Sequence, residues 1–355
     1  MRVEIEESRA VSLDLALNNS RSPSVGSWQR QLQMQHLNLS GKGDRFNVGY
    51  GNTDGSNSLD FGYSYPLSPR NDRLSLNASF TRSDVIEEPF DILAINAESS
   101  SFNLSYRYPL VETPSREIGV GASLSRRQTQ ARFIEELNAP FPSPGSDDDG
   151  RTVIHELNLF QDYTKRSEQD FWSLRSQLSA GLPFLGASDQ EGDEPDSQYF
   201  LARGQAQYGR ALAPEALFLA RASLQLASRP LVPLTQFGVG GASTVRGYRQ
   251  DVLLGDSGWF ASAEVRWPLL RSGPRQASQL QIVPFLDAGG AFNRGDRPNP
   301  DPNFIASTGL GLRFESGDRR FFGQVNYGIP LVEVEGEGDS LQARGLNLSF
   351  RYRWF

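Results

Sequence analysis

The sequence contains no cysteine among its 355 residues and only two histidines, His36 and His155. The missing thiols exclude disulfide frameworks, thiolate zinc sites and cysteine nucleophiles. Two histidines cannot form a three-histidine metal site, and they leave few candidates for a catalytic histidine. No run of roughly 18 or more consecutive apolar residues occurs, which excludes a membrane-spanning helix.

Basic charge is also in short supply, because 35 Lys and Arg face 42 Asp and Glu, a formal net charge of −7. This balance argues against a nucleic-acid partner, since phosphate contacts need a basic surface. The stretch Met1-Arg2-Val3-Glu4 has no basic region followed by an apolar core, so we expect no signal peptide in this chain. Aromatic residues are plentiful at 11% although the mean hydropathy is low. A closed membrane β-barrel reconciles these features.

Apolar and polar residues alternate strictly along many short segments. Transmembrane strands need only about 9–11 residues, with apolar side chains toward lipid and polar ones toward a wet lumen. The resulting signal has a period of two residues, whereas helical spacing fits none of these segments. The clearest examples are residues 59–65, 74–80, 102–108, 172–175, 218–224, 259–267 and 346–354.

Together with the turns between them, these patterns predict an all-β fold, a sixteen-stranded antiparallel transmembrane barrel formed by residues 10–355. Sixteen strands with their connections use the whole chain, and an even number of antiparallel strands closes without a free edge. The expected strands are 10–18, 28–40, 44–53, 57–66, 72–82, 98–108, 116–131, 151–163, 169–182, 197–210, 215–228, 257–268, 278–291, 303–315, 320–330 and 342–355.

The lengths of the connections favour the same count. Barrels of this kind have short periplasmic turns and long outer loops. We predict short turns after even-numbered strands, as at 41–43 and 109–114, and long loops after odd-numbered ones, as at 133–150 and 229–256. Prolines at 66, 109 and 268 are expected to end their strands. A soluble β-sandwich would also alternate, but each strand here has one dry face and none resembles a two-faced core strand.

Several tempting motifs have plainer explanations. Four Asn-x-Ser sequons begin at Asn38, Asn77, Asn103 and Asn347, and each falls within a predicted strand on its polar face. His155 precedes Glu156, but His36 is too distant in sequence to make a two-histidine metal site a good prediction. No Gly-x-Ser-x-Gly elbow, Walker loop or dinucleotide fingerprint occurs. We therefore predict no catalytic residues, no metal and no cofactor, although the fold itself does not rule out an enzyme.

Eight arginines of the predicted strands have lumen parity, whereas acid clusters fall in the long outer loops. They suggest a cationic, water-filled interior, whereas the alternative is that they pair with nearby acids such as Asp14 and Asp60 and stiffen the wall. The arginines concerned are Arg107, Arg175, Arg203, Arg221, Arg266, Arg313, Arg351 and Arg353.

Residues 237–256 stand apart from the other connections. A long loop without periodicity is usually functional or disordered, and apolar residues such as Val245, Tyr248 and Leu253 are poor composition for disorder. Glycines at 240, 241 and 247 allow tight backbone turns. This segment is predicted to fold as a compact plug.

Arg246 lies in the middle of this segment. Two carboxylates on the following strands, Glu264 and Asp287, have lumen parity and are candidate partners. A guanidinium offers a planar, bidentate geometry that lysine does not copy. Such a latch would hold an outer loop down inside the barrel. The alternative is that Arg246 is an ordinary exposed arginine. The residues by themselves favour neither the latch nor this alternative.

An ordered set of motifs brings a family resemblance. Val245-Arg246-Gly247-Tyr248 follows Gly240-Gly241, then come Gly255-Asp256 with Gly258, then Ala263-Glu264, then Asp287 with Gly289. Over essentially the whole chain this order resembles the BamA-like superfamily of outer-membrane barrels, and within it the two-partner-secretion (TpsB-type) transporters. The resemblance implies a loop that enters the lumen and an arginine that contacts acidic residues on the wall. Those roles fall on Arg246, Glu264 and Asp287, with Val245, Gly247 and Tyr248 beside them and the glycines and Asp256 as supporting turns.

The resemblance also implies a function and its partners. We expect an outer-membrane pore of a Gram-negative-type bacterium that exports a large unfolded partner protein, with neither cofactor nor ATP. The expected partners are the secreted protein, outer-membrane lipid and the barrel assembly machinery. The alternatives are a BamA-like insertase for other barrels and a passive plugged porin.

Both ends of the chain carry further expectations from the family. Residues 1–9 are interpreted as a linker or the remnant of a preceding POTRA module, and the POTRA modules themselves are expected outside this chain. Trp354 and Phe355 are interpreted as the C-terminal signal read by the assembly machinery. Phe355 departs from the pattern, because its parity places it on the polar register of the last strand.

Overall fold

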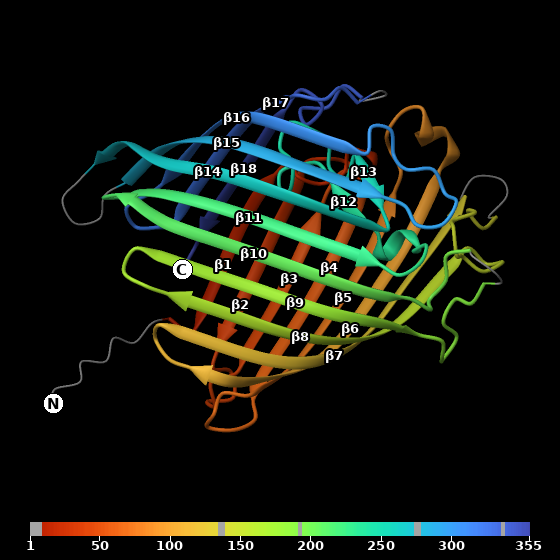
Figure 1. The fold of residues 1–355 in the computed structure, drawn as a ribbon, viewed down its shortest axis with the longest axis horizontal. Coiled ribbons are helices and arrows are strands. Elements are labelled where there is room, and N and C mark those ends of the chain that lie inside the picture. The colour runs from red at the N-terminus through yellow and green to blue at the C-terminus, as the bar shows by residue number, and fades with distance from the viewer. Residues whose placement is uncertain (1–8, 134–138, 191–193, 273–277, 335–337) are drawn as a thin grey trace.

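The computed structural model describes residues 9–133, 139–190, 194–272, 278–334 and 338–355. Its strands form one closed barrel of sixteen antiparallel members (Figure 1). The barrel strands are β1 (Val11–Asn18), β2 (Gln29–Leu37), β3 (Arg45–Asn52), β4 (Ser56–Pro66), β5 (Arg73–Asp84), β6 (Ile95–Glu112), β7 (Arg116–Phe133), β8 (Arg151–Arg166), β9 (Asp170–Leu182), β10 (Phe200–Ala213), β11 (Ala216–Ala227), β14 (Ser257–Ser272), β15 (Ser278–Phe292), β16 (Phe304–Glu315), β17 (Phe321–Pro330) and β18 (Leu346–Arg353).

The remaining elements are small. β12 (Phe237–Val239) and β13 (Leu253–Gly255) pair as a separate two-stranded sheet. The described connections contain three short 3-10 helices, namely η1 (Pro23–Val25), η2 (Phe90–Leu93) and η3 (Pro233–Thr235). Among the described residues, no helix has the length and apolar character needed to cross a membrane. The predicted remnant at 1–9 falls, apart from Arg9, outside the described residues.

Each strand pairs with its neighbours in sequence, except that β11 pairs directly with β14. β1 pairs with β18 to close the barrel, in a register that runs from Asp14↔Arg353 to Asn18↔Ser349. Every predicted strand corresponds to one observed barrel strand, so the predicted fold class is confirmed. The soluble β-sandwich is wrong because the sheet closes on itself.

Alternation explains why these segments form a barrel wall. On β15, Leu286 points outward and is 56% exposed, whereas its neighbours Phe285 and Asp287 are buried inside. On β1, Leu15 and Leu17 are exposed on the outer face in the same way. An outward apolar set is stable only against lipid, so the wall presents one dry face to the membrane and one polar face to the lumen.

The two ends of the barrel differ. In Figure 1 the C-terminus lies toward the left end with the short turns, and most long connections gather at the right end. The predicted parity has one exception, the short connection 53–55 after β3. This hairpin is tied to the connection before β2, since Gly55 N–H donates to the Val25 carbonyl at 3.2 Å. The connection after β1 therefore packs on the turn between β3 and β4.

Some predicted boundaries are wrong. The last strand is Leu346–Arg353 rather than 342–355, because Gly345 turns with φ of 80° just before it. Pro109 and Pro268 do not end their strands; each lies within its strand at a bulge where the register shifts by one residue. A bulge accommodates a proline because the extra residue leaves the ladder locally.

Apolar packing is concentrated near one end of the barrel. Both buried apolar clusters lie where residues 229–256 meet the wall. One cluster contains Ile154, Tyr199, Leu201, Ala227, Leu231 and Val232, and the other contains Val239, Val245, Tyr248, Leu253, Ala291 and Ile305.

Candidate functional site

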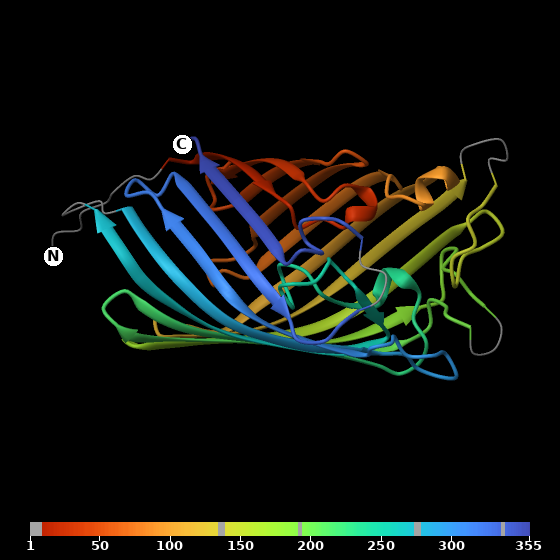
Figure 2. The ribbon, with the colours of Figure 1, turned by 90° about the horizontal axis from the view of Figure 1, so that it is seen from above.

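Residues 229–256, which we call the lumen loop, leave β11 and turn into the barrel before the chain rejoins the wall at β14 (Figure 2). η3 lies near the start of the loop, and the β12–β13 hairpin frames its tip, with Phe237↔Gly255 and Val239↔Leu253 in register. The segment is therefore compact, as predicted, but it does contain regular structure. Strands of three residues are too short to produce a period-two signal in the sequence.

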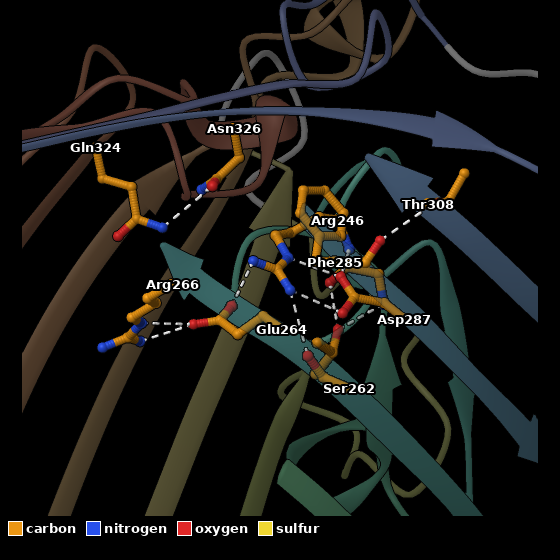
Figure 3. Close-up of polar contacts among 11 residues, drawn as sticks. Arg246, Ser262, Glu264, Arg266, Phe285, Asp287, Thr308, Gln324 and Asn326 are labelled. Carbon is orange, nitrogen blue, oxygen red and sulfur yellow. Dashed lines mark hydrogen bonds and ion pairs between the residues drawn. The ribbon is translucent and has the colours of Figure 1, made fainter. Parts of the chain in front are cut away.

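Arg246 projects from the tip of the lumen loop to the wall (Figure 3). Its Nε and Nη2 donate to the two carboxylate oxygens of Asp287 at 2.7 and 2.9 Å. Its backbone N–H donates to Asp287 as well, at 3.1 Å. Nη1 donates to Glu264 at 2.9 Å, and Nη2 lies 3.3 Å from the Ser262 hydroxyl. One guanidinium thus joins the loop to two adjacent strands.

Strand register explains how these partners come together. Ser262 and Glu264 lie two residues apart on β14, and Phe285 and Asp287 lie two residues apart on β15, so all four face the lumen. Ser262 pairs with Asp287, and Glu264 with Phe285. The guanidinium carbon of Arg246 lies 3.7 Å from the centroid of the Phe285 ring, a cation–π contact.

The cluster is buried and its charges balance. The side chains of Arg246, Glu264 and Asp287 are 2%, 4% and 0% exposed. Arg266 adds a second cation, with Nη2 2.7 Å from Glu264. Burial alone would lower the pKa of Arg246, but hydrogen bonds to Asp287 and the charges of Asp287 and Glu264 raise it above its ordinary value. Arg246 is therefore charged at every physiological pH.

The neighbours of Arg246 allow the loop to approach the wall closely. Gly247 has φ of 97°, and its backbone packs directly on Gly328 of β17. A Cβ added at Gly328 would lie 2.5 Å from the Gly247 nitrogen. Val245 and Tyr248 are buried on either side, and the Tyr248 hydroxyl lies 2.8 Å from the carbonyl oxygens of Ala306 and Val332.

The predicted supporting glycines occupy tight positions around the hairpin. Gly240 and Gly241 have φ of 119° and 90°, which favours glycine. A Cβ at Gly289 would lie 2.7 Å from Val239, and one at Gly258 would lie 2.4 Å from the Phe237 ring. Gly255 packs on the backbone of residues 291–292. These positions let the hairpin lie flat against β14 and β15.

Asp256 has a larger role in the geometry than the predicted supporting turn. It is fully buried and lies 2.5 Å from Nη2 of Arg297, in the connection after β15. It also accepts backbone N–H groups from Leu231 at 3.0 Å and Arg294 at 2.7 Å. Asp256 therefore ties both ends of the lumen loop to the next connection. The sequence reasoning missed Arg297, because parity says nothing about residues in loops.

A second anchor, also missed, holds the first part of the lumen loop. Arg127 of β7 donates to the Leu234 carbonyl at 2.9 Å and to Glu156 of β8 at 2.9 Å. The Tyr199 hydroxyl donates to the same Glu156 at 2.8 Å. Burial, followed by the charge of Glu156, raises the pKa of Tyr199. The lumen parity of Glu156 was visible in the sequence, but its loop partner was not.

Other singled-out residues lie elsewhere. Trp354 and Phe355 follow β18, and the Trp354 N–H donates to the Leu13 carbonyl of β1 at 2.8 Å. His36 and His155 lie in β2 and β8, which are not neighbours. Across the described ranges, no group of three or more His, Asp or Glu side chains is placed to hold a metal ion.

Known proteins resemble this chain in sequence and in fold. The sequence profile of the family described as haemolysin secretion/activation protein ShlB/FhaC/HecB matches residues 1–314. The chain is 27% identical over 164 residues to the outer membrane transporter CdiB of Escherichia coli strain 536, covering 45% of this chain and 27% of that protein. It is 23% identical over 329 residues to CdiB of Dickeya dadantii strain 3937, covering 89% of this chain and 56% of that protein.

A solved structure of CdiB from Escherichia coli superposes with a TM-score of 0.82 at 18% sequence identity. The match covers 99% of this chain and 64% of that one, and it shows a shared fold. The chain spans about a quarter to about half of the length of the two curated relatives.

Proposed function

The chain belongs to the ShlB/FhaC/HecB family of haemolysin secretion/activation proteins, and from this premise we propose that it forms an export pore gated by its lumen loop. In this proposal a large, unfolded partner protein crosses the outer membrane of a Gram-negative bacterium through the barrel. The lumen loop closes the pore at rest, and Arg246 acts as the latch that holds the loop in place. Family membership supports export, and the site geometry supports the gate.

One observation carries the gating proposal, namely the burial of Arg246 against Asp287 and Glu264 at the loop tip. Hydrogen bonds to charged groups contribute about 1.5–3 kcal/mol each. Removing one partner of a buried ion pair costs roughly 3–5 kcal/mol. These magnitudes are large enough to keep a loop inside the lumen, yet within reach of a binding event that replaces the contacts.

The proposed partners follow from the family. The exported protein would enter from the periplasmic end after contact with POTRA modules, and its folding outside the cell would supply the energy, with no cofactor and no ATP. The barrel assembly machinery would insert the chain into outer-membrane lipid, with Trp354 and Phe355 as the signal it reads. A porin with a fixed plug is the competing proposal, and it predicts no exported partner.

Export can be tested in cells that encode this chain beside a large secreted protein. Deleting the chain should abolish release of that protein, and restoring it should return release. In planar bilayers, Arg246→Ala should raise the ionic conductance, because the unlatched loop no longer fills the lumen. Arg344→Ala is a matched control, since Arg344 pairs with Asp339 on the exposed surface. Unchanged conductance and unchanged release in Arg246→Ala would reject the gate.

A further inference from the structure

A polar cavity of about 640 Å³ lies between the tip of the lumen loop and the wall formed by β17, β18 and β1. Its volume falls within the range of about 300–1,000 Å³ that is typical of ligand sites. The wall side is lined by Asn18, Gln324, Asn326, Asn347 and Ser349, and the loop side includes residues 242–243 and 250–251. The connection after β1 completes the lining, with Arg21 among its residues. The cavity therefore opens onto the segment whose release is proposed to open the pore.

Strand register arranges the wall residues of this cavity in two rows. Asn326 of β17 lies directly opposite Asn347 of β18. Gln324, Ser349 and Asn18 form the second row across β17, β18 and β1. Gln324 Nε2 donates to Asn326 Oδ1 at 3.1 Å (Figure 3). This part of the wall offers uncharged donors and acceptors.

Asn347 differs from its neighbours in these rows because its buried side-chain amide has no hydrogen-bond partner among the described residues. It is 3% exposed, and within the described part of the chain neither its Nδ2 nor its Oδ1 has a hydrogen-bond partner. Buried polar side chains are almost always hydrogen-bonded. An unpaired buried amide that lines a cavity is therefore a site suited to a ligand with one donor and one acceptor.

We infer that this cavity binds a short extended stretch of another polypeptide through its backbone, with Asn347 pairing with one N–H and one C=O group. The side-chain amide of asparagine presents the same donor and acceptor as a peptide unit. The uncharged wall residues offer hydrogen bonds to a backbone, whereas the charged lining side chains, Arg21 and Asp251, lie on the connection after β1 and on the lumen loop. The inference rests on the proposed export function and adds the place where the exported chain is held.

The test uses the purified protein with a photo-crosslinking residue at Gln324 and a synthetic, uncharged peptide of glycine, serine and asparagine as the probe. Asn347→Leu should lower the crosslinking yield about three- to tenfold, the factor expected for losing a hydrogen-bonded amide. Asn347→Gln should recover part of the yield. Asn77→Leu is the matched control, because Asn77 occupies the same Asn-x-Ser pattern on β5 and does not line this cavity.

Equal yields in Asn347→Leu and the unmodified protein, or equal losses in Asn347→Leu and Asn77→Leu, would overturn the inference. Should Asn347→Leu fail to assemble, Asn326→Leu on the facing strand makes the same test with the same expected loss. The release assay separates this result from the proposed function. If the secreted partner is released normally and the crosslinking yield does not depend on Asn347, the cavity site is rejected and export is retained. If the partner is not released but the yield does depend on Asn347, export is rejected and the cavity site is retained.

Discussion

Arg246 makes its contacts through the geometry of its side chain as well as through its charge. Three nitrogens of one planar group contact two carboxylates on adjacent strands, and its ring contact with Phe285 fixes the plane. A lysine carries the same charge but presents a single donor group at its end. Replacing Arg246 with lysine therefore tests the shape of the side chain while its charge is kept.

Arg246→Lys should give a partly released loop, intermediate between the unmodified protein and Arg246→Ala. The ammonium can reach Asp287 or Glu264 but not bridge both, so we expect a loss of about 1.5–3 kcal/mol in the free energy that holds the loop. Conductance in planar bilayers measures the released fraction. A lysine variant as closed as the unmodified protein would show that bidentate geometry is not required.

Gly328→Ala should displace the lumen loop without replacing any charged residue. The added Cβ would lie 2.5 Å from the Gly247 nitrogen and 2.8 Å from the Arg246 carbonyl carbon, and backbone cannot move aside as a side chain does. Overpacking of this kind costs about 1–3 kcal/mol. We expect faster proteolysis within the lumen loop. Gly323→Ala on the same strand is the control, because its Cβ would meet ring atoms at 3.4 Å.

The lumen loop is an element whose tip and base are attached through different residues. Its tip is held by Arg246, and its base is held by Asp256, which contacts Arg297, Leu231 and Arg294. Because the base lies at the end of β11 and the start of β14, it can stay fixed while the tip moves. The two attachments should therefore respond separately to mutation.

Asp256→Asn should loosen the base of the loop and leave the wall intact. The substitution removes the charge of the buried Asp256 and so breaks its ion pair with Arg297. Because Arg297 is 30% exposed, water can solvate it in part, which limits the loss of stability. We expect faster hydrogen exchange in residues 229–256 and an unchanged melting temperature of the barrel. Asp339→Asn is the control, as Asp339 is 82% exposed. Faster exchange in the wall strands as well would contradict this separation.

How far the sequence predicts this molecule depends on the kind of element. Alternation located every barrel strand, because one face meets lipid and the other meets water along its whole length. Parity also placed Glu264 and Asp287 on the lumen face, and both contact Arg246. Arg297 and the pairing of Arg127 with Leu234 were missed, because partners within loops follow no period. The close approach of Gly247 to Gly328 exists only in the folded chain.

At the scale of the whole molecule, the lumen arginines mostly have local partners. Arg107 pairs with Asp162, Arg266 with Glu264, and Arg353 with Asp14. Arg175 lies over the Phe160 ring. These contacts favour the interpretation that the arginines stiffen the wall through local pairs. They argue against the interpretation that the arginines make the interior cationic.

The seam where β1 pairs with β18 allows a test that distinguishes export from insertion of other barrels. Insertion of other barrels would require this seam to open, whereas export through the lumen would not. A disulfide in Leu17→Cys/Phe350→Cys joins a directly opposed pair across the seam, in a chain with no other cysteine. We expect the oxidised protein to release its partner normally. A disulfide in Leu15→Cys/Leu32→Cys, between β1 and β2, is the control. If the disulfide between β1 and β18 stops release of the partner and the disulfide between β1 and β2 does not, insertion would be favoured.

Both apolar clusters lie between the lumen loop and the wall, so the loop buries its own small core while the cylinder is completed by hydrogen bonds and lipid. Mutations that alter the ease of opening therefore need not weaken the cylinder. In the proposed gate, such a division would let natural selection adjust how readily the passage opens while a single membrane scaffold is inherited unchanged.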